Sequence, residues 1–175
     1  MRPEIIEKAK KIRMLLLDVD GVLTDGSILY GSGRQEMKAF FVHDGLGIRM
    51  AGRAGILVAF VSARESEMVA RRASELQVSE VHQRAEDKIS LWERLLEKYH
   101  LSPENVAVMG DDLTDLPLLG RAGLSIAVAN AVKEVKGRVD LITAHEGGRG
   151  AVREVTDLLL QAQGQYGEEL GRYLA

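Results

Sequence analysis

Cysteine is absent from all 175 residues, and neither sign of charge dominates, since 23 basic side chains stand against 26 acidic ones. Without thiols the chain has neither disulfides nor thiolate metal sites. Any metal must be held by carboxylate, carbonyl or imidazole groups, and this favours a hard cation such as Mg²⁺. The nearly balanced charge gives no global field that steers the protein to nucleic acid or to an anionic membrane. A small soluble partner is therefore expected.

Long apolar runs are also missing, because none approaches the roughly 20 residues that a membrane helix needs. Residues 1–8 are too charged for the apolar stretch of a signal peptide, so a cytoplasmic location is the default expectation. The chain is nevertheless 46% hydrophobic, which is enough for a core. No repeat, low-complexity tract or linker divides it, and we expect residues 1–175 to form a single domain.

Short apolar runs alternate with helical patterns along the chain. The first run, Met14 to Leu17, opens at its carboxyl end into Asp18-Val19-Asp20-Gly21. Further strands are expected near 56–61, 80–82, 106–109, 124–128 and 140–143, and helices near 46–54, 65–76, 87–99, 113–121, 131–136 and 149–163. The alternation predicts an α/β fold, a Rossmann-like parallel sheet with helices on both faces. In such sheets, ligands bind at the carboxyl ends of the strands.

Two segments depart from this alternation. Residues 27–42 have the pattern of a hairpin, in which Gly31-Ser32-Gly33 forms the turn and Met37 to Val42 the returning strand. We expect a protruding β-hairpin over about 27–41 that covers a site or pairs with another chain. The tail, about 164–175, is expected to be frayed or to depend on a partner.

Three predicted strand ends carry groups suited to phosphate chemistry. Of the first pair, Asp18 and Asp20, one carboxylate can attack phosphorus while the other moves protons. A Mg²⁺ ion bridging Asp18, Asp111 and the phosphate would offset the negative charge of the nucleophile. Ser62 can donate a hydrogen bond to a phosphate oxygen, and Lys88 can place a positive charge beside the transferring group.

Simpler interpretations compete with these roles. An Asp pair before glycine is ordinary turn chemistry, but a second acidic strand end at Asp111 argues against that reading. Ser62 suits a helix N-cap, with Glu65 completing a capping box, and this role is compatible with phosphate binding. Asp112 and Asp115 suit caps of the next helix, so we assign them supporting roles.

The order and spacing of these elements are similar to the four motifs of the haloacid dehalogenase superfamily: Asp18 to Thr24, Ser62, Lys88 and Gly110-Asp111-Asp112. In that superfamily a second Asp in the first motif marks phosphatases and phosphomutases, so Asp20 implies phosphate-ester chemistry. A response-regulator receiver also has acidic strand ends, but its phosphoacceptor would be expected on a middle strand. Here the acidic pair follows the first predicted strand, and this argues against a receiver.

Nearly the whole chain resembles the 3-deoxy-D-manno-octulosonate 8-phosphate (KDO 8-phosphate) phosphatases, through Asp25-Gly26, Gly31, Glu36, Lys38, Phe40, Asp44-Gly45-x-Gly47-Ile48-Arg49, Arg64, Arg72 and Gly147 to Glu154. The resemblance implies Asp18 as nucleophile, Asp20 as acid/base, and Mg²⁺ held by Asp18, Asp111 and the backbone carbonyl of Asp20. It implies phosphate contacts from Ser62 and Lys88. It also implies that three arginines lie around the substrate, where a carboxylate would suit a guanidinium: Arg49, Arg64 and Arg72.

The sequence departs from the family pattern near the expected sugar site. Phe41 stands where the family usually has Asn, His43 where it usually has Arg, and Ala63 where it usually has Gly. The phosphate of a related nine-carbon keto-sugar acid therefore remains an alternative substrate.

The resemblance also bears on assembly. The stretch from the hairpin to the second strand, and the stretch from Lys88 to Asp111, are both too short for a cap domain. The family covers its sites by forming a tetramer whose hairpins pair, and we predict the same homotetramer, with the tail after Arg149 near a neighbouring site. The alternatives are an uncapped phosphatase of a protein or nucleic acid, and a non-catalytic interaction module, which the intact catalytic set argues against.

Overall fold

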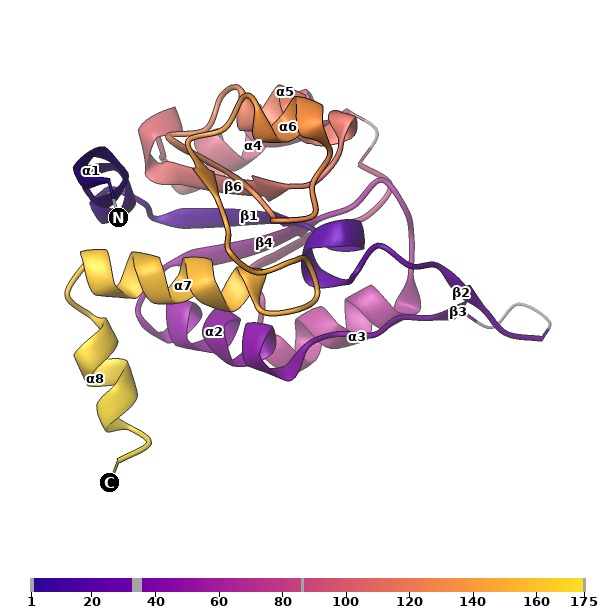
Figure 1. Ribbon diagram of the computed structural model, residues 1–175, viewed down its shortest axis with the longest axis horizontal. Coiled ribbons are helices and arrows are strands. Elements are labelled where there is room, and N and C mark those ends of the chain that lie inside the picture. Colours follow the sequence, from indigo (N-terminus) through magenta and orange to yellow (C-terminus); the bar gives the residue numbers. More distant parts are fainter. Residues whose placement is uncertain (1, 33–35, 86, 175) are drawn as a thin grey trace.

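The computed structural model describes residues 2–32, 36–85 and 87–174 and contains a six-stranded parallel sheet in the order β5-β4-β1-β6-β7-β8. The strands of this sheet are β1 (Met14–Asp18), β4 (Leu57–Val61), β5 (Glu80–His82), β6 (Val106–Gly110), β7 (Leu124–Ala127) and β8 (Leu141–Ile142). Helices α4, α5 and α6 lie on one side of the sheet in Figure 1, and α2, α3 and α7 on the other. The predicted Rossmann-like α/β fold is confirmed.

The α-helices are α1 (Pro3–Lys10), α2 (Val42–Arg53), α3 (Glu67–Leu76), α4 (Lys88–Tyr99), α5 (Leu116–Leu119), α6 (Lys133–Lys136), α7 (Ala151–Ala162) and α8 (Tyr166–Gly171). Helices α2 to α7 lie close to predicted positions, whereas α1 and α8 were not predicted. Among the described residues, no helix has the length and apolar character to cross a bilayer.

The central strand β1 explains where the functional residues meet. Met14 to Leu17 are buried, and β1 pairs in parallel with both β4 and β6. Parallel strands place their carboxyl ends at the same edge of a sheet. Asp18, Ser62 and Asp111, which end or directly follow β1, β4 and β6, therefore lie along one edge.

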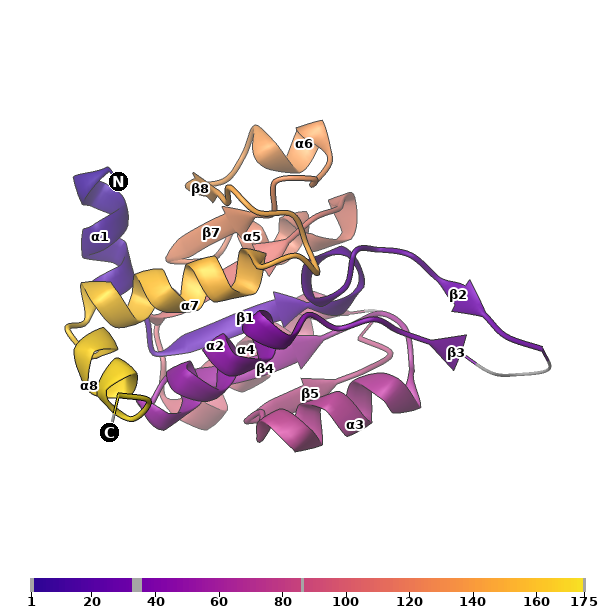
Figure 2. The same cartoon turned by 60° about the horizontal axis from the view of Figure 1, so that its bottom comes forward.

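The hairpin is shorter than predicted. Its strands are β2 (Leu29–Tyr30) and β3 (Glu36–Met37), which pair in antiparallel fashion, and it projects away from the sheet (Figure 2). Gly33, which belongs to the predicted turn, lies outside the described residues. The extension of the returning strand to Val42 was wrong, because the chain leaves the hairpin after Met37 and α2 begins at Val42.

Helix α2 begins before its predicted start because tertiary contacts override the glycines in its first turns. The buried Asp44 carboxylate accepts hydrogen bonds from the backbone N–H groups of Gly150 (3.3 Å) and Arg153 (2.8 Å), which ties α2 to the start of α7. A Cβ atom on Gly47 would lie 2.2 Å from the Thr156 hydroxyl, so glycine is what allows the two helices to approach so closely.

The predicted capping box of Ser62 and Glu65 was also wrong. The Ser62 hydroxyl accepts a hydrogen bond from the Arg64 backbone N–H at 3.0 Å, and α3 begins only at Glu67, after Ser66. Ser62 therefore belongs to a tight turn at the end of β4 rather than to a helix cap.

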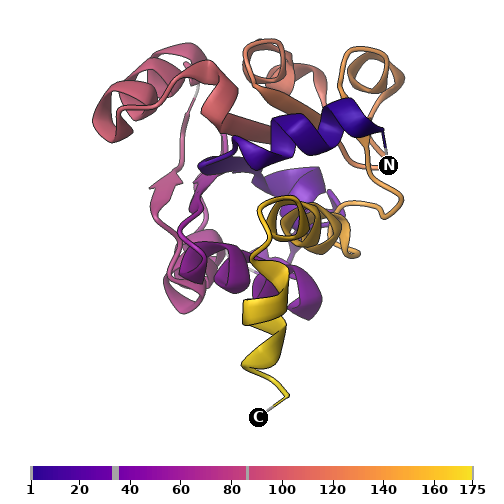
Figure 3. The same ribbon diagram turned by 90° about the vertical axis from the view of Figure 1, so that its left-hand side faces the viewer.

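Part of the tail, Tyr166–Gly171, forms helix α8 and is not frayed as expected, whereas its dependence on a partner stays a prediction. After α7 the chain turns into α8, which runs away from the sheet (Figure 3). Arg53 of α2 donates from its Nε atom to the buried Glu169 carboxylate at 2.9 Å, and this ion pair anchors α8 to the body of the protein. Helix α7 is no tail either, since its apolar face is buried in the core.

Candidate active site

Three carboxylates cluster at the carboxyl edge of the sheet. One oxygen each from Asp18, Asp111 and Asp115 can be chosen so that all lie within 4.8 Å of one another, the one such grouping found among the described residues. Asp18 ends β1, Asp111 follows β6, and Asp115 closes the short 3₁₀ turn after β6. The sequence predicted the first two as neighbours and gave the third a supporting role.

Lys88 is the cation that this cluster contacts. It is the first residue of α4, whose start is fixed by Asp87, which accepts hydrogen bonds from the backbone N–H groups of Ile89 and Ser90. Its Nζ atom lies 2.6 Å from Asp115 Oδ1 and 3.1 Å from Asp18 Oδ1. Burial lowers the pKa of Lys88, but the two carboxylates outweigh burial and raise it, so the side chain stays charged.

Asp115 uses both of its carboxylate oxygens. Oδ1 accepts from Lys88, and Oδ2 accepts from the backbone N–H groups of Asp111 (3.0 Å) and Asp112 (3.3 Å). Asp112 accepts from the Leu113 backbone N–H at 2.7 Å, as expected of a cap. Asp115 therefore orients Lys88 and the Asp111 loop, and this geometry suits support better than metal binding.

The cluster carries more negative charge than Lys88 balances. Burial first, and then the charge of Asp115, raise the pKa of Asp18 to about 8 and that of Asp111 to about 7. Asp111 lies over the backbone of Gly21, where a Cβ atom would come 2.1 Å from Asp111 Oδ2. Buried carboxylates with a raised pKa and oxygen-only donors are what a hard divalent cation would stabilise, so the residues present fit Mg²⁺.

Asp20 has different surroundings from Asp18. The strand ends at Asp18, and Val19–Leu23 form a kinked turn in which Asp20 and Gly21 have non-helical backbone angles, so the two-residue period of a strand does not place the second carboxylate. Asp20 Oδ1 instead accepts a hydrogen bond from Lys38, whose side chain is only 2% exposed. Sequence reasoning gave Lys38 no role beyond its place in the family resemblance.

The remaining predicted site residues differ in their placement. Ser62 is buried at the end of β4, and its hydroxyl, which accepts from the Arg64 backbone N–H, donates to no residue that the structure describes. The Arg64 Nη2 atom lies 3.7 Å from Glu36 of the hairpin. Arg72 lies against the Gly45 backbone and over the Phe40 ring, whereas Arg49 makes no ion pair with any residue that the structure describes.

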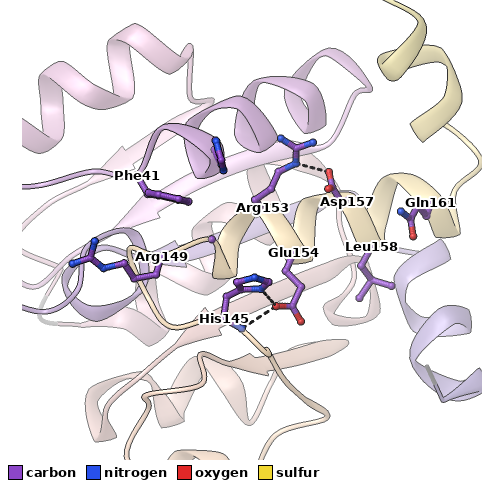
Figure 4. Close-up of a pocket in the computed structure, with 10 residues that line it drawn as sticks. Phe41, His145, Arg149, Arg153, Glu154, Asp157, Leu158 and Gln161 are labelled. Atoms are coloured by element: carbon purple, nitrogen blue, oxygen red, sulfur yellow. Dashed lines mark hydrogen bonds and ion pairs between the residues drawn. The ribbon is translucent and has the colours of Figure 1, made fainter. Parts of the chain in front are cut away.

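The two unusual residues, Phe41 and His43, line a pocket of about 620 Å³ with side chains of α7 from Arg153 to Gln161 (Figure 4). Their rings meet edge to face, with centroids 4.9 Å apart. Arg149 lies at one side of this pocket, and its guanidinium is 3.6 Å from the Asp25 carboxylate. The pocket therefore adjoins the loop that follows Asp18 and Asp20.

The fold and the acidic edge define a haloacid dehalogenase-like hydrolase, and residues 61–155 match that family. The 3-deoxy-D-manno-octulosonate 8-phosphate phosphatase KdsC of Escherichia coli K12 is 47% identical over 169 residues, which are 97% of this chain and 90% of the relative. The chain belongs to the KDO 8-phosphate phosphatase family.

Solved structures of similar proteins agree with this family assignment. The Moraxella catarrhalis KDO 8-phosphate phosphatase, in complex with magnesium, phosphate and KDO, superposes with a TM-score of 0.96 at 40% identity and 99% coverage of both chains. The cobalt-bound Haemophilus influenzae phosphatase gives a TM-score of 0.88 at 38% identity, covering 93% of this chain and 98% of that one.

Proposed function

We propose that this protein is a Mg²⁺-dependent phosphatase that hydrolyses KDO 8-phosphate to KDO and phosphate through an aspartyl-phosphate intermediate. The observation that carries the proposal is the group of Asp18, Asp111 and the buried Lys88 at the carboxyl edge of the sheet, in a chain of this family. A nucleophile, a cation and oxygen ligands for a metal meet there.

In the first half-reaction, an Asp18 oxygen attacks phosphorus as the bond between phosphorus and the sugar oxygen breaks. The electron pair of that bond goes to the sugar oxygen, which takes a proton from Asp20. Lys88 and Ser62 bind the phosphoryl oxygens and stabilise the charge that develops on them. Asp18 then carries the phosphoryl group as an acyl phosphate.

In the second half-reaction, a water molecule attacks phosphorus and gives a proton to the Asp20 carboxylate. The bond from phosphorus to the Asp18 oxygen breaks, phosphate leaves, and both aspartates return to their starting states. Asp20 must therefore hold a proton for one step and accept one in the next.

Asp18, Asp111 and the backbone carbonyl of Asp20 are the proposed Mg²⁺ ligands. When bound, the ion supplies positive charge that lets an anionic carboxylate approach an anionic phosphate. The substrate arginines are proposed to be Arg49, Arg64 and Arg72, and Asp112 and Asp115 are proposed to support the site.

We further propose a cytoplasmic homotetramer of single-domain chains, assembled through the hairpins. Several exposed apolar side chains gather on the two hairpin strands and beside them: Ile28, Leu29, Tyr30 and Met37. Exposed apolar side chains concentrated on one projecting element favour contact with another chain over solvent. The small sugar-acid substrate fits this assembly, because the neighbouring chain would cover a site that has no cap.

A related nine-carbon sugar-acid phosphate is the second candidate substrate. It is favoured by the Phe41 and His43 rings, which give the pocket beside the catalytic loop an aromatic wall. The family usually has an amide and a permanent cation at these positions. A macromolecular phosphate is the third candidate and requires a monomer with an open site.

Phosphate release with Mg²⁺ across KDO 8-phosphate, nine-carbon sugar-acid phosphates, simple sugar phosphates and a phosphopeptide tests the proposal. We expect the wild type to prefer KDO 8-phosphate, and we expect Asp18→Asn to abolish the release of phosphate from it. Asp140→Asn is a matched control, because this carboxylate pairs with Lys8 at the amino end of β8. Preference for another sugar acid would favour the second candidate, and activity on the phosphopeptide alone would overturn the proposal.

A further inference from the structure

The carboxylate of Asp20 is held from the hairpin side by a buried lysine. Lys38, directly after β3, donates to Asp20 Oδ1, and its Nζ atom lies 3.5 Å from Glu36 Oε1. The Glu36 oxygen in turn lies 3.7 Å from Arg64 Nη2. Alternating charges thus run from Asp20 through Lys38 and Glu36 to Arg64, which stands two residues beyond Ser62.

Both hairpin strands contribute to this charged row. Glu36 belongs to β3, and it pairs in register with Tyr30 of β2. The Tyr30 hydroxyl, followed by the charges of Asp20 and Glu36, raises the pKa of Arg64. The base of the hairpin is therefore joined to the catalytic edge by side-chain contacts, and not only through the chain.

Burial of Lys38 calls for an explanation. Its side chain is 2% exposed, and lysine is rarely buried unless it is paired. Its two ion-pair partners among the described residues are Asp20 and Glu36, and of these only Asp20 makes a hydrogen bond with it. The closest contact of this buried cation is thus the residue with the proposed proton-transfer role.

The geometry also leaves room for that role. A carboxylate on a loop can rotate, and a loss of orientation at a proton-transfer group is costly. Lys38 engages Oδ1 of Asp20 and leaves Oδ2 without a hydrogen bond to any described residue. One oxygen is therefore anchored while the other is available to exchange a proton with the sugar oxygen or with water.

We propose that Lys38 is a positioning residue that fixes the orientation of the Asp20 carboxylate for proton transfer, and that the hairpin thereby controls the acid/base step. This inference rests on the acid/base role given to Asp20 under the proposed function. Lys38 acts through Asp20 and does not itself touch the transferring group.

Two other roles for Lys38 make different predictions. A purely structural lysine would, on removal, lower stability and reduce every activity in proportion to the folded fraction. A substrate-binding lysine would, on removal, raise KM for the sugar phosphate and leave kcat nearly unchanged. A positioning lysine lowers kcat, and its loss matters least when the leaving group needs no proton.

The test compares first turnovers of the wild type and Lys38→Met on KDO 8-phosphate and on 4-nitrophenyl phosphate, at saturating Mg²⁺. Nitrophenolate leaves without protonation, whereas a sugar alkoxide does not. We expect the sugar-ester turnover to fall by about tenfold to a hundredfold at nearly unchanged KM. The nitrophenol burst should stay within about threefold of wild type and be followed by slow turnover, since attack by water still needs Asp20.

Two further variants complete the design. Lys38→Arg keeps a cation with a donor and should recover part of the sugar-ester rate. Lys98→Met removes another ion-paired lysine, whose side chain is 60% exposed and pairs with Glu80, and should leave the activity on both substrates unaffected. Thermal unfolding and the mass in solution of each variant separate loss of fold or assembly from loss of orientation.

An equal fall on both substrates in a folded Lys38→Met protein, or a rise in KM alone, would overturn the inference. Failure of the wild type on KDO 8-phosphate would instead overturn the substrate assignment. The role of Lys38 would then be read from whichever alkyl phosphate the wild type hydrolyses, against the same aryl ester.

Discussion

The two aspartates of the first motif are two residues apart, yet different parts of the molecule hold them. Asp18 lies on the central strand of the sheet and contacts the buried Lys88, which begins α4. Asp20 lies beyond the strand end and contacts Lys38, which directly follows the projecting hairpin. The proposed nucleophile is thus fixed by the core, and the proposed acid/base by the segment that leaves an element with an exposed apolar surface.

This difference suggests a division of labour. Strands and helices packed in a core hold a nucleophile and a metal ligand without help from another chain. A two-stranded hairpin is marginal by itself and is stabilised by packing against something else. Proton transfer should therefore be more sensitive to the assembly state than phosphate binding is.

The largest expected effect is at the nucleophile. Asp18→Asn removes the attacking oxygen but keeps the size of the side chain, and phosphatase activity should fall by at least about a thousandfold. Steady-state phosphate release measures it, with Asp140→Asn as control. A residual rate above a tenth of wild type would contradict the assignment of Asp18.

Next in size is the loss of the core cation. Lys88→Met leaves Asp18 and Asp115 buried without their partner, and the free energy of unfolding should fall by about 3 kcal/mol. Denaturant titration measures this change. Lys98→Met removes a lysine that is itself 60% exposed and should cost no more than about 1 kcal/mol. Equal costs for the two variants would mean that the acidic edge does not depend on Lys88.

Breaking the proposed contact between the hairpins of neighbouring chains should have a smaller effect on activity, and this effect should arise from loss of assembly. Leu29 and Met37 face each other across the hairpin and are 47% and 56% exposed. Leu29→Ser with Met37→Ser should dissociate the proposed tetramer and lower activity about tenfold, because Asp20 loses its fixed orientation. Light scattering and kinetics on the same samples measure both effects.

The matched control for the hairpin variant is Ile142→Ser with Val81→Ser, at two exposed apolar positions outside the hairpin and the tail. It should remain tetrameric and active. A wild-type protein that is monomeric at assay concentration would remove the basis for this coupling.

The pH dependence of the metal-free protein comes next. Asp18 and Asp111 have folded pKa values of about 8 and about 7, above the 3.8 of a free Asp. Between the free pKa of 3.8 and these folded pKa values, the native state therefore binds more protons than the unfolded state. The free energy of unfolding falls as pH rises through this range. Mg²⁺ binds the ionised carboxylates, so the rise in Tm that it causes should be larger at about pH 8.5 than at about pH 6.

Thermal unfolding with and without Mg²⁺ at the two pH values measures this effect. Asp111→Asn should abolish most of the Mg²⁺-dependent difference. An equal rise in Tm at both pH values would show that protons do not compete with the metal at the acidic edge.

The smallest effect is expected in the pocket beside the catalytic loop. Phe41→Asn with His43→Arg restores the usual family residues and should change KM for KDO 8-phosphate by about threefold or less, with kcat unchanged. Kinetics on KDO 8-phosphate and on a nine-carbon analogue measure it. A reversal of preference between the two substrates would make these residues the determinants of specificity.

The features that could be predicted from the sequence belong to the core around Asp18, and the features around Asp20 could not be predicted. Strand β1 and the acids at the ends of β1 and β6 were predictable, because buried parallel strands have continuous apolar runs and their ends share an edge. The start of α2 was not, because the glycines of its first turns are accommodated by contacts with α7 that only the fold supplies.

The contacts of Asp20 could not be predicted for a similar reason. Local periodicity ends with the strand at Asp18, and the partner of Asp20 comes from the segment after the hairpin, 18 residues along the chain. No propensity or spacing rule links an extended segment after a hairpin to a preceding loop. Helix α8 was missed because contacts with distant residues anchor it, chiefly the ion pair between Arg53 and the buried Glu169.

The most direct test of the account asks whether Asp18 carries the phosphoryl group. The protein is mixed with excess 4-nitrophenyl phosphate and Mg²⁺, quenched at successive times, reduced with borohydride and analysed by peptide mass spectrometry. We predict that residue 18 is converted to homoserine in the wild type, more strongly in Lys38→Met, and not in Asp18→Asn. Nitrophenol release matched by free phosphate from the first time point, with residue 18 unmodified in both Asp18-containing proteins, would contradict the account.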